Sequence, residues 1–263
     1  MRGTFIVLEG ADGSGKSRQA RLLDERLAAL LGPEASHLTR QPSTREIGRL
    51  IRRSLTGEIA LAAEAMPALF AADRADHVAH VVKPALEQGM HVVCDRYVLS
   101  NLVYRAAEAR GPFLRCSVCG WAGEPADADT IDDRPLTCPR CKEAPLLLAE
   151  KVLDRIRWAQ SLDQHLLVPD LTIVLMVSPE VAAARRKTRG GAPETYERDA
   201  FQARCCAAYA RAAELVRPGE QVELVDGDGT EDEVAEQVWA VIEPVVMGRP
   251  VRAPAVTLTE ETG

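Results

Sequence analysis

A glycine-rich segment near the N-terminus has the residue types and the spacing of a loop that binds phosphate. Gly10 and the triplet Gly15-Lys16-Ser17 satisfy the pattern G-x-x-x-x-G-K-[ST]. In this pattern the glycines let backbone N–H groups turn toward a polyphosphate, the lysine reaches the β- and γ-phosphates, and the hydroxyl ligates Mg²⁺. We therefore predict a nucleotide-binding loop that comprises Gly10, Ala11, Asp12, Gly13, Ser14, Gly15, Lys16 and Ser17.

The sequence on either side of this loop is that of a buried strand and an amphipathic helix. Apolar residues fill 5–8, and leucines recur at helical spacing over 16–31. A helix that starts at Lys16 would direct its positive N-terminal end at a bound anion. The alternative is an ordinary glycine turn that ends in Lys-Ser. Such a turn would not need a strand before it and a helix after it.

Strand and helix patterns alternate along the chain, which indicates a parallel sheet covered by helices on both faces. We predict strands at 4–8, 36–39, 91–94, 171–177 and 221–225. We predict helices at 16–31, 45–55, 60–88, 100–109, 149–166, 179–187, 195–216 and 231–246, with Pro67 near a helix start or a kink. The predicted fold class is α/β, a three-layer sandwich of the P-loop NTPase type with a five-stranded parallel sheet.

The composition excludes two classes of partner. The chain has 263 residues and a formal net charge of −7, so a broad basic face for nucleic acid is not expected. No apolar stretch approaches the roughly 20 residues that span a bilayer. The predicted first strand occupies the place where a secretory signal would have its apolar region. We expect a soluble, cytoplasmic protein without nucleic-acid or membrane partners.

Residues 112–147 interrupt the alternation of strands and helices. They contain two Cys-x-x-Cys pairs, Cys116/Cys119 and Cys138/Cys141, which are eighteen residues apart, as in a structural zinc ribbon. Four thiolates would close a tetrahedral Zn²⁺ site, so the metal would fold the segment rather than react. We predict one domain over 1–247, interrupted by a zinc ribbon at 112–147 and followed by a disordered tail at 248–263.

Three further segments carry an arginine toward the edge of the predicted sheet. Arg40 and Arg96 follow predicted strands, and Arg74 lies on the long predicted helix 60–88. The carboxyl ends of parallel strands open on the same edge as the glycine loop, which is where ligands bind. Each arginine alone could be an ordinary surface cation. Together they predict a second anion site that faces the nucleotide.

With the glycine loop, these segments resemble the thymidylate kinase family, whose members transfer the γ-phosphate of ATP to dTMP. The resemblance runs over nearly all of 1–245, apart from the ribbon. It includes Pro-Asp-Leu-Thr at 169–172, Val-Ser-Pro-Glu at 177–180 and the arginine-rich stretch 185–190 before Tyr-Glu-Arg at 196–198. It implies a homodimeric enzyme of dTTP synthesis that converts dTMP to dTDP, with ATP and dTMP as substrates and Mg²⁺ as cofactor.

The resemblance also implies which residues hold dTMP. Phe70 would stack on the thymine, Asn101 would read the base, and Tyr104 would lie against the sugar where a 2′-hydroxyl would clash. The acceptor phosphate would be held by Arg40, Arg74 and Arg96. The full set implied to bind dTMP is Arg40, Phe70, Arg74, Arg96, Asn101 and Tyr104.

The implied catalytic groups are mostly cations. A phosphate monoester needs no general base near neutral pH because its second pKa is about 6. Ser17 and Asp95 would hold Mg²⁺, and a lid that carries Arg185 and Arg189 would supply the positive charge that the side chains of the glycine loop lack. The residues implied to act in catalysis are Asp12, Lys16, Arg96, Arg185 and Arg189.

Two departures from the family pattern stand out. Gln41 and Ser43 occur where bacterial relatives usually have Glu and Gly, which bears on affinity or base preference, and the ribbon is an addition. Other functions are also open. A deoxynucleoside kinase would need a general base for a neutral hydroxyl, another nucleoside monophosphate kinase would share the loop, and a regulatory protein would bind nucleotide without turnover.

Overall fold

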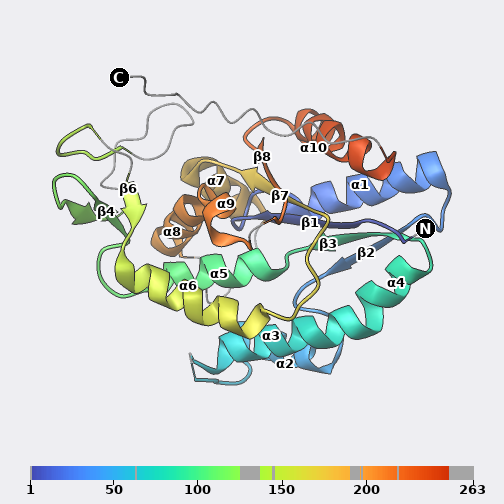
Figure 1. The fold of residues 1–263 in the computed structure, drawn as a ribbon, viewed down its shortest axis with the longest axis horizontal. Coiled ribbons are helices and arrows are strands. Elements are labelled where there is room, and N and C mark those ends of the chain that lie inside the picture. The colour runs from blue at the N-terminus through green and yellow to red at the C-terminus, as the bar shows by residue number, and fades with distance from the viewer. Residues whose placement is uncertain are drawn as a thin grey trace.

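The computed structural model describes residues 2–62, 64–124, 137–143, 146–189, 196, 198–217 and 219–248 (Figure 1). Its main sheet has five parallel strands in the order β2-β3-β1-β7-β8. The strands are β1 (Phe5–Gly10), β2 (Ser36–Arg40), β3 (His91–Asp95), β7 (Leu171–Met176) and β8 (Val222–Asp226). The predicted five-stranded parallel sheet is confirmed, and each strand overlaps its predicted range.

Helices cover both faces of this sheet, and an apolar core fills the space on each side. On one face, α1 (Lys16–Leu31) and α10 (Glu231–Val246) bury Leu23 and Trp239 against strand residues such as Leu8. On the other face lie α5 (Val98–Ala107), α6 (Glu150–Asp163) and α8 (Asp199–Tyr209). The remaining helices are α2 (Glu46–Leu55), α3 (Ala65–His77), η1 (Val78–Val82), α4 (Lys83–Glu87), α7 (Pro179–Arg189) and α9 (Ala212–Leu215).

Two long predicted helices are divided in the structure. The predicted helix 60–88 begins only at Ala65 and is interrupted by the π-helical turn η1. Pro84 follows that turn and has no backbone N–H, and a wider turn keeps its ring away from the carbonyl of His80. Pro67 lies in the first turn of α3, as predicted. The predicted helix 195–216 is divided between α8 and α9.

A second, smaller sheet lies in the predicted insertion. It is antiparallel and has the order β5-β4-β6, with β4 (Leu114–Cys116), β5 (Ala122–Gly123) and β6 (Leu146–Leu148). Phe113, Leu114, Leu146 and Leu148 are buried in the same apolar core as helices α5, α6 and α8. The small sheet is therefore packed directly onto the helical layer (Figure 1).

Two other predictions concern the ends and the environment of the chain. The tail predicted to be disordered lies outside the described residues from position 249 onward, and the predicted domain limits stay a prediction. Among the helices that the structure describes, none has the length and apolar character to cross a membrane.

Candidate active site

The carboxyl ends of β1, β2 and β3 open into a cavity of about 730 Å³. This edge is where open α/β sheets bind their ligands. The predicted site residues that line it are Asp12, Gly13, Gly15, Lys16, Ser17, Arg40, Phe70, Arg74, Asp95, Arg96, Asn101, Tyr104 and Arg185. The structure thus brings the glycine loop and the predicted second anion site into one cavity.

The conformation of the loop explains its glycines. Gly15 has a φ of 88° and directly precedes α1, in the left-handed region that only glycine adopts freely. A Cβ atom at Gly13 would lie 2.4 Å from the carbonyl oxygen of Ala182, so no larger residue fits there. Since α1 begins at Lys16, the unpaired N–H groups of its first turn lie at the loop, where an anion would bind.

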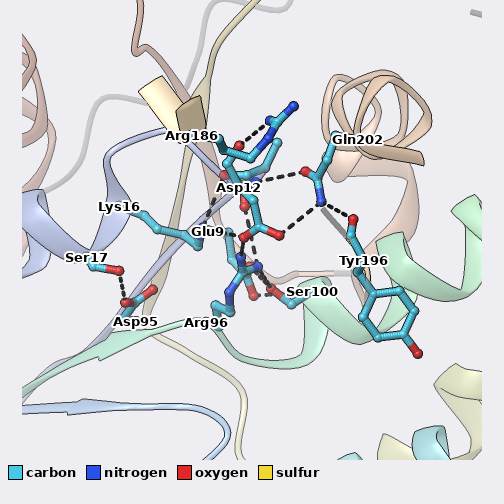
Figure 2. A network of polar contacts seen from close by, with 12 residues as sticks. Glu9, Asp12, Lys16, Ser17, Asp95, Arg96, Ser100, Arg186, Tyr196 and Gln202 are labelled. Atoms are coloured by element: carbon cyan, nitrogen blue, oxygen red, sulfur yellow. Dashed lines mark hydrogen bonds and ion pairs between the residues drawn. The ribbon is translucent and has the colours of Figure 1, made fainter. Parts of the chain in front are cut away.

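Asp12 is the centre of a polar network in this cavity (Figure 2). Its carboxylate is paired with Arg96, lies 3.5 Å from the Lys16 ammonium, and accepts a hydrogen bond of 2.8 Å from the Tyr104 hydroxyl. Burial by itself raises the pKa of Asp12, but the charges of Arg96 and Lys16 outweigh it and hold the pKa well below its usual range. Asp12 is therefore ionised near neutral pH and orients both cations.

Arg96 is held in a conformation that few non-glycine residues adopt. Its φ is 73°, directly after the end of β3. Its guanidinium donates to the Ser100 hydroxyl at 2.9 Å and lies 5.5 Å from the centre of the Tyr104 ring. Strained residues of this kind persist where the surrounding contacts fix them, commonly at functional sites.

Two residues of the network, Gln202 and Glu9, were missed by the sequence analysis, and a third, Arg186, was included only as part of the arginine-rich stretch 185–190. Gln202 accepts a hydrogen bond of 2.9 Å from the Asp12 N–H and donates to the Asp12 carboxylate at 3.0 Å. Arg186 donates to the Asp12 carbonyl at 2.7 Å. The buried Glu9 accepts from the Ser100 N–H at 3.0 Å, which fixes the start of α5. A carboxylate that ends an apolar run, and a glutamine on a buried helix face, are signals that could have identified two of them.

The arginine-rich stretch contacts the cavity differently from the prediction. Arg185 lines the cavity, but its guanidinium donates to the carbonyls of Gly227 at 2.7 Å and Gly229 at 3.0 Å. Arg186, rather than Arg185, contacts the glycine loop. The side chain of Arg189 lies outside the described residues. The catalytic roles of Arg185 and Arg189 stay predictions.

The end of β3 and the start of α1 bring together two oxygen ligands. The Ser17 hydroxyl donates to one carboxylate oxygen of Asp95, and the other oxygen, Oδ1, is buried with no hydrogen-bond partner in the described part of the chain. Hydroxyl and carboxylate oxygens are the ligands that Mg²⁺ prefers. The donor set fits the predicted magnesium site.

The arginines predicted to hold the acceptor phosphate differ in exposure and in whether a carboxylate of the protein already pairs with them. Arg40 is exposed at the end of β2, and the described residues offer it no ion pair. Arg74 is 2% exposed and is paired with the Asp163 carboxylate at 2.8 Å. Because the Asp163 carboxylate already neutralises the charge of Arg74, a bound phosphate would be stabilised more by the charge of Arg40.

The four cysteines of the insertion form one cluster. The sulfur atoms of Cys116, Cys119, Cys138 and Cys141 all lie within 4.8 Å of one another. The Cys116–Cys141 and Cys119–Cys138 separations are 3.7 and 3.5 Å, close to the roughly 3.8 Å edge of a tetrahedron with Zn–S bonds of about 2.3 Å. The arrangement fits a closed metal site.

Comparisons with known proteins bear on both the fold and the family. The profile of the family described as "Thymidylate kinase" matches residues 8–122. A solved thymidylate kinase from Candida albicans has a TM-score of 0.65 and 27% identity and covers 93% of this chain and 92% of its own. A thymidylate kinase from Ehrlichia chaffeensis shares the fold, with a TM-score of 0.59 at 20% identity.

Relatives in sequence match over nearly the whole chain. The probable thymidylate kinase of Pyrococcus abyssi is 31% identical over 94% of this chain and 100% of its own length. The thymidylate kinase of Nitrobacter winogradskyi is 35% identical over 92% of this chain and 88% of its own. That of Leifsonia xyli subsp. xyli is 37% identical over 90% and 92%. The chain therefore belongs to the thymidylate kinase family.

Proposed function

We propose that this chain converts dTMP to dTDP by transferring the γ-phosphate of Mg-bound ATP within the cavity at the sheet edge. Phosphorylation of dTMP is the activity of the family to which the chain belongs. One observation carries the proposal for the cavity. The glycine loop and the arginine, aromatic and amide side chains from β2, α3 and α5 line the same space, so a donor and an acceptor nucleotide would meet there.

The donor half of this site is formed by the glycine loop. Its N–H groups and Lys16 would hold the β- and γ-phosphates of ATP. Ser17 and Asp95 would hold Mg²⁺, which when bound offsets the negative charge of the phosphates. The buried, unpartnered Asp95 Oδ1 supports this assignment.

The transfer needs positive charge rather than a base. An oxygen of the dTMP phosphate attacks the γ-phosphorus, the bond from that phosphorus to the β-phosphate oxygen breaks, and ADP leaves. Lys16 and Arg96 would stabilise the charge on the transferring group, and Arg40 would hold the acceptor phosphate. Asp12 keeps both catalytic cations in place and receives the Tyr104 hydroxyl at the predicted sugar position.

We also propose a structural zinc ion on Cys116, Cys119, Cys138 and Cys141. A site with four thiolate ligands has no open position, so this metal would hold the small sheet together rather than react. The sulfur separations support this assignment. A homodimer in the cytoplasm is a further proposal, which rests on the family resemblance, and sedimentation equilibrium would test the dimer.

The deciding experiment measures ADP release from Mg-ATP with dTMP, dUMP, dCMP, dAMP, dGMP or thymidine as the acceptor. We expect a strong preference for dTMP in wild type. Turnover of dTMP should be lost in Arg40→Ala and retained in Arg49→Ala, whose arginine lies on the exposed surface of α2. Turnover of thymidine but not of dTMP would favour a deoxynucleoside kinase. ATP binding without ADP release for any acceptor would favour a regulatory protein.

A further inference from the structure

Asp163 is a buried carboxylate that lies behind the wall of the cavity. It is the last residue of α6, is 3% exposed and is not among the lining residues. Its two oxygens accept hydrogen bonds from Arg74 and from the side-chain amide of Asn101. Both of these partners do line the cavity. A buried carboxylate with two such partners fixes how each of them faces the space in front.

The contact with Arg74 uses one edge of the guanidinium. Nε donates to Asp163 at 3.1 Å, and Nη2 donates to both carboxylate oxygens at 2.9 and 2.8 Å. The remaining Nη1 group has no hydrogen-bond partner among the described residues. Since a guanidinium has its donors in a rigid, planar fork, this side-on pairing fixes the direction of the Nη1 donors. The pairing also cancels the charge of Arg74, which suits a neutral base rather than a phosphate.

The contact with Asn101 fixes the orientation of its amide. Only the NH₂ group can face a carboxylate, and Nδ2 lies 3.3 Å from Asp163 Oδ2. The carbonyl oxygen Oδ1 is buried and has no partner in the described part of the chain. A buried acceptor of this kind beside a cavity is where a donor from a bound ligand would complete the hydrogen bond.

We propose that Asp163 is the positioning residue that sets the base selectivity of the acceptor site. It leaves a donor on Arg74 and an acceptor on Asn101, which match O4 and N3–H of thymine or uracil. Cytosine presents the opposite pattern, a donor at N4 and an acceptor at N3. Phe70 lines the same cavity and offers a ring against which the base would stack. The inference rests on the proposed dTMP kinase function and specifies how that site excludes dCMP.

Asp163→Asn tests this assignment because it removes the carboxylate and leaves the shape of the side chain. With a neutral partner, the Arg74 guanidinium is no longer fixed and the Asn101 amide can turn its NH₂ group toward the cavity, where it would donate to N3 of cytosine. We expect kcat/KM for dTMP to fall by about tenfold or more, chiefly through KM, and the ratio of dTMP to dCMP efficiency to narrow by about tenfold or more. The control is Asp154→Asn, an exposed carboxylate on the same helix, which should change neither.

Two further measurements distinguish a loss of base selectivity from a general disturbance of the folded structure. ATP affinity, measured with a fluorescent analogue, should be the same in wild type and in Asp163→Asn, because the glycine loop does not contact Asp163. The swap Asp163→Asn with Asn101→Asp keeps one amide and one carboxylate in contact at these two positions and places an acceptor at position 101. It should recover at least part of the dTMP preference.

The possible failures are distinct. If wild type does not phosphorylate dTMP, the proposed function is wrong. If wild type does so and Asp163→Asn keeps the same dTMP to dCMP ratio within about twofold, the inference about Asp163 is wrong, whatever happens to the rate. A swap that recovers none of the preference would also count against the inference, because an acceptor at position 101 would then not restore the selection of thymine.

Discussion

Single residues of the cavity act mainly by orienting one another. Asp12, for example, pairs with Lys16 and Arg96 and also receives the Gln202 amide. The sequence predicted the first three from the motif and the family resemblance. Gln202 comes from a segment 190 positions away, and only the fold brings it to the loop, so spacing could not reveal it.

Gln202→Ala should slow phosphoryl transfer. The substitution leaves the partly buried Asp12 N–H and carboxylate without one partner each, so the loop loses part of its orientation. We expect kcat to fall about tenfold, with a stability loss of about 1–3 kcal/mol. Steady-state kinetics and urea unfolding would measure both. Gln164→Ala, at an exposed position after α6, is the matched control. Unchanged kcat in Gln202→Ala would contradict an orienting role.

His77 should make the stability depend on pH. It is buried between the Thr39 hydroxyl, at 2.7 Å, and the Gln41 amide, at 3.2 Å. Burial lowers its pKa from 6.5 to about 4, although the nearby Asp73 raises it. This contact also gives a structural reason for Gln41, since its amide NH₂ can donate to the neutral ring and a glutamate could not.

The sign of the effect follows from linkage. Because the folded pKa of His77 lies below the unfolded value, its contribution is fully present above about pH 6.5 and is lost as the pH falls toward about 4. The largest loss is ~3 kcal/mol. Urea unfolding should show that the free energy of unfolding falls less between pH 7.5 and pH 5 in His77→Gln than in wild type. The exposed His80→Gln should behave as wild type.

At the scale of elements, alternating patterns predicted the sheet well. Each of the predicted strands is present because buried parallel strands read as short apolar runs, such as 171–176. The helix predicted over 60–88 was too long at its start, and η1 was not foreseen. Periodicity continues through such a turn, and only the local effect of Pro84 interrupts it.

Helix α8 connects the small sheet to the active site through Arg204. Its guanidinium donates to the Ala109 carbonyl at 2.6 Å, just after α5, and to the Gly111 carbonyl at 3.1 Å, and it pairs with Glu124 after β5. Gln202 lies on the same helix and contacts Asp12. Helix α8 therefore contacts both the small sheet and the glycine loop, and we expect a change at one to be felt at the other.

Arg204→Lys should loosen this junction and keep its charge, since an ammonium cannot reach three groups that a planar fork reaches at once. We expect faster amide hydrogen exchange in α8 and at the end of α5, and a fall of about threefold or more in kcat/KM for dTMP. Arg157→Lys, on the exposed face of α6, should change neither. Unchanged exchange in α8 would show that Arg204 does not connect the two parts.

For the whole molecule, the position of the cysteine cluster decides how metal affects stability. Cys116 and Cys138 are buried in the same apolar core as α5, α6 and α8. The sequence predicted the ligands from their spacing, but it suggested a module separate from the α/β core. Apolar residues such as Phe113 and Leu148 join that core only once the chain is folded. Loss of metal should therefore destabilise the domain rather than the small sheet alone.

Metal removal tests this continuity. Reduced protein should contain about one equivalent of zinc, and Cys116→Ser or Cys138→Ser should lower that content. Calorimetry of chelated protein should show one unfolding transition, shifted down by at least ~5 °C, which returns to its original midpoint when zinc is added back. A shared core melts as a unit because neither part keeps its buried area without the other. Two separate transitions, with the larger one at the temperature of the zinc-loaded protein, would show that the ribbon unfolds on its own.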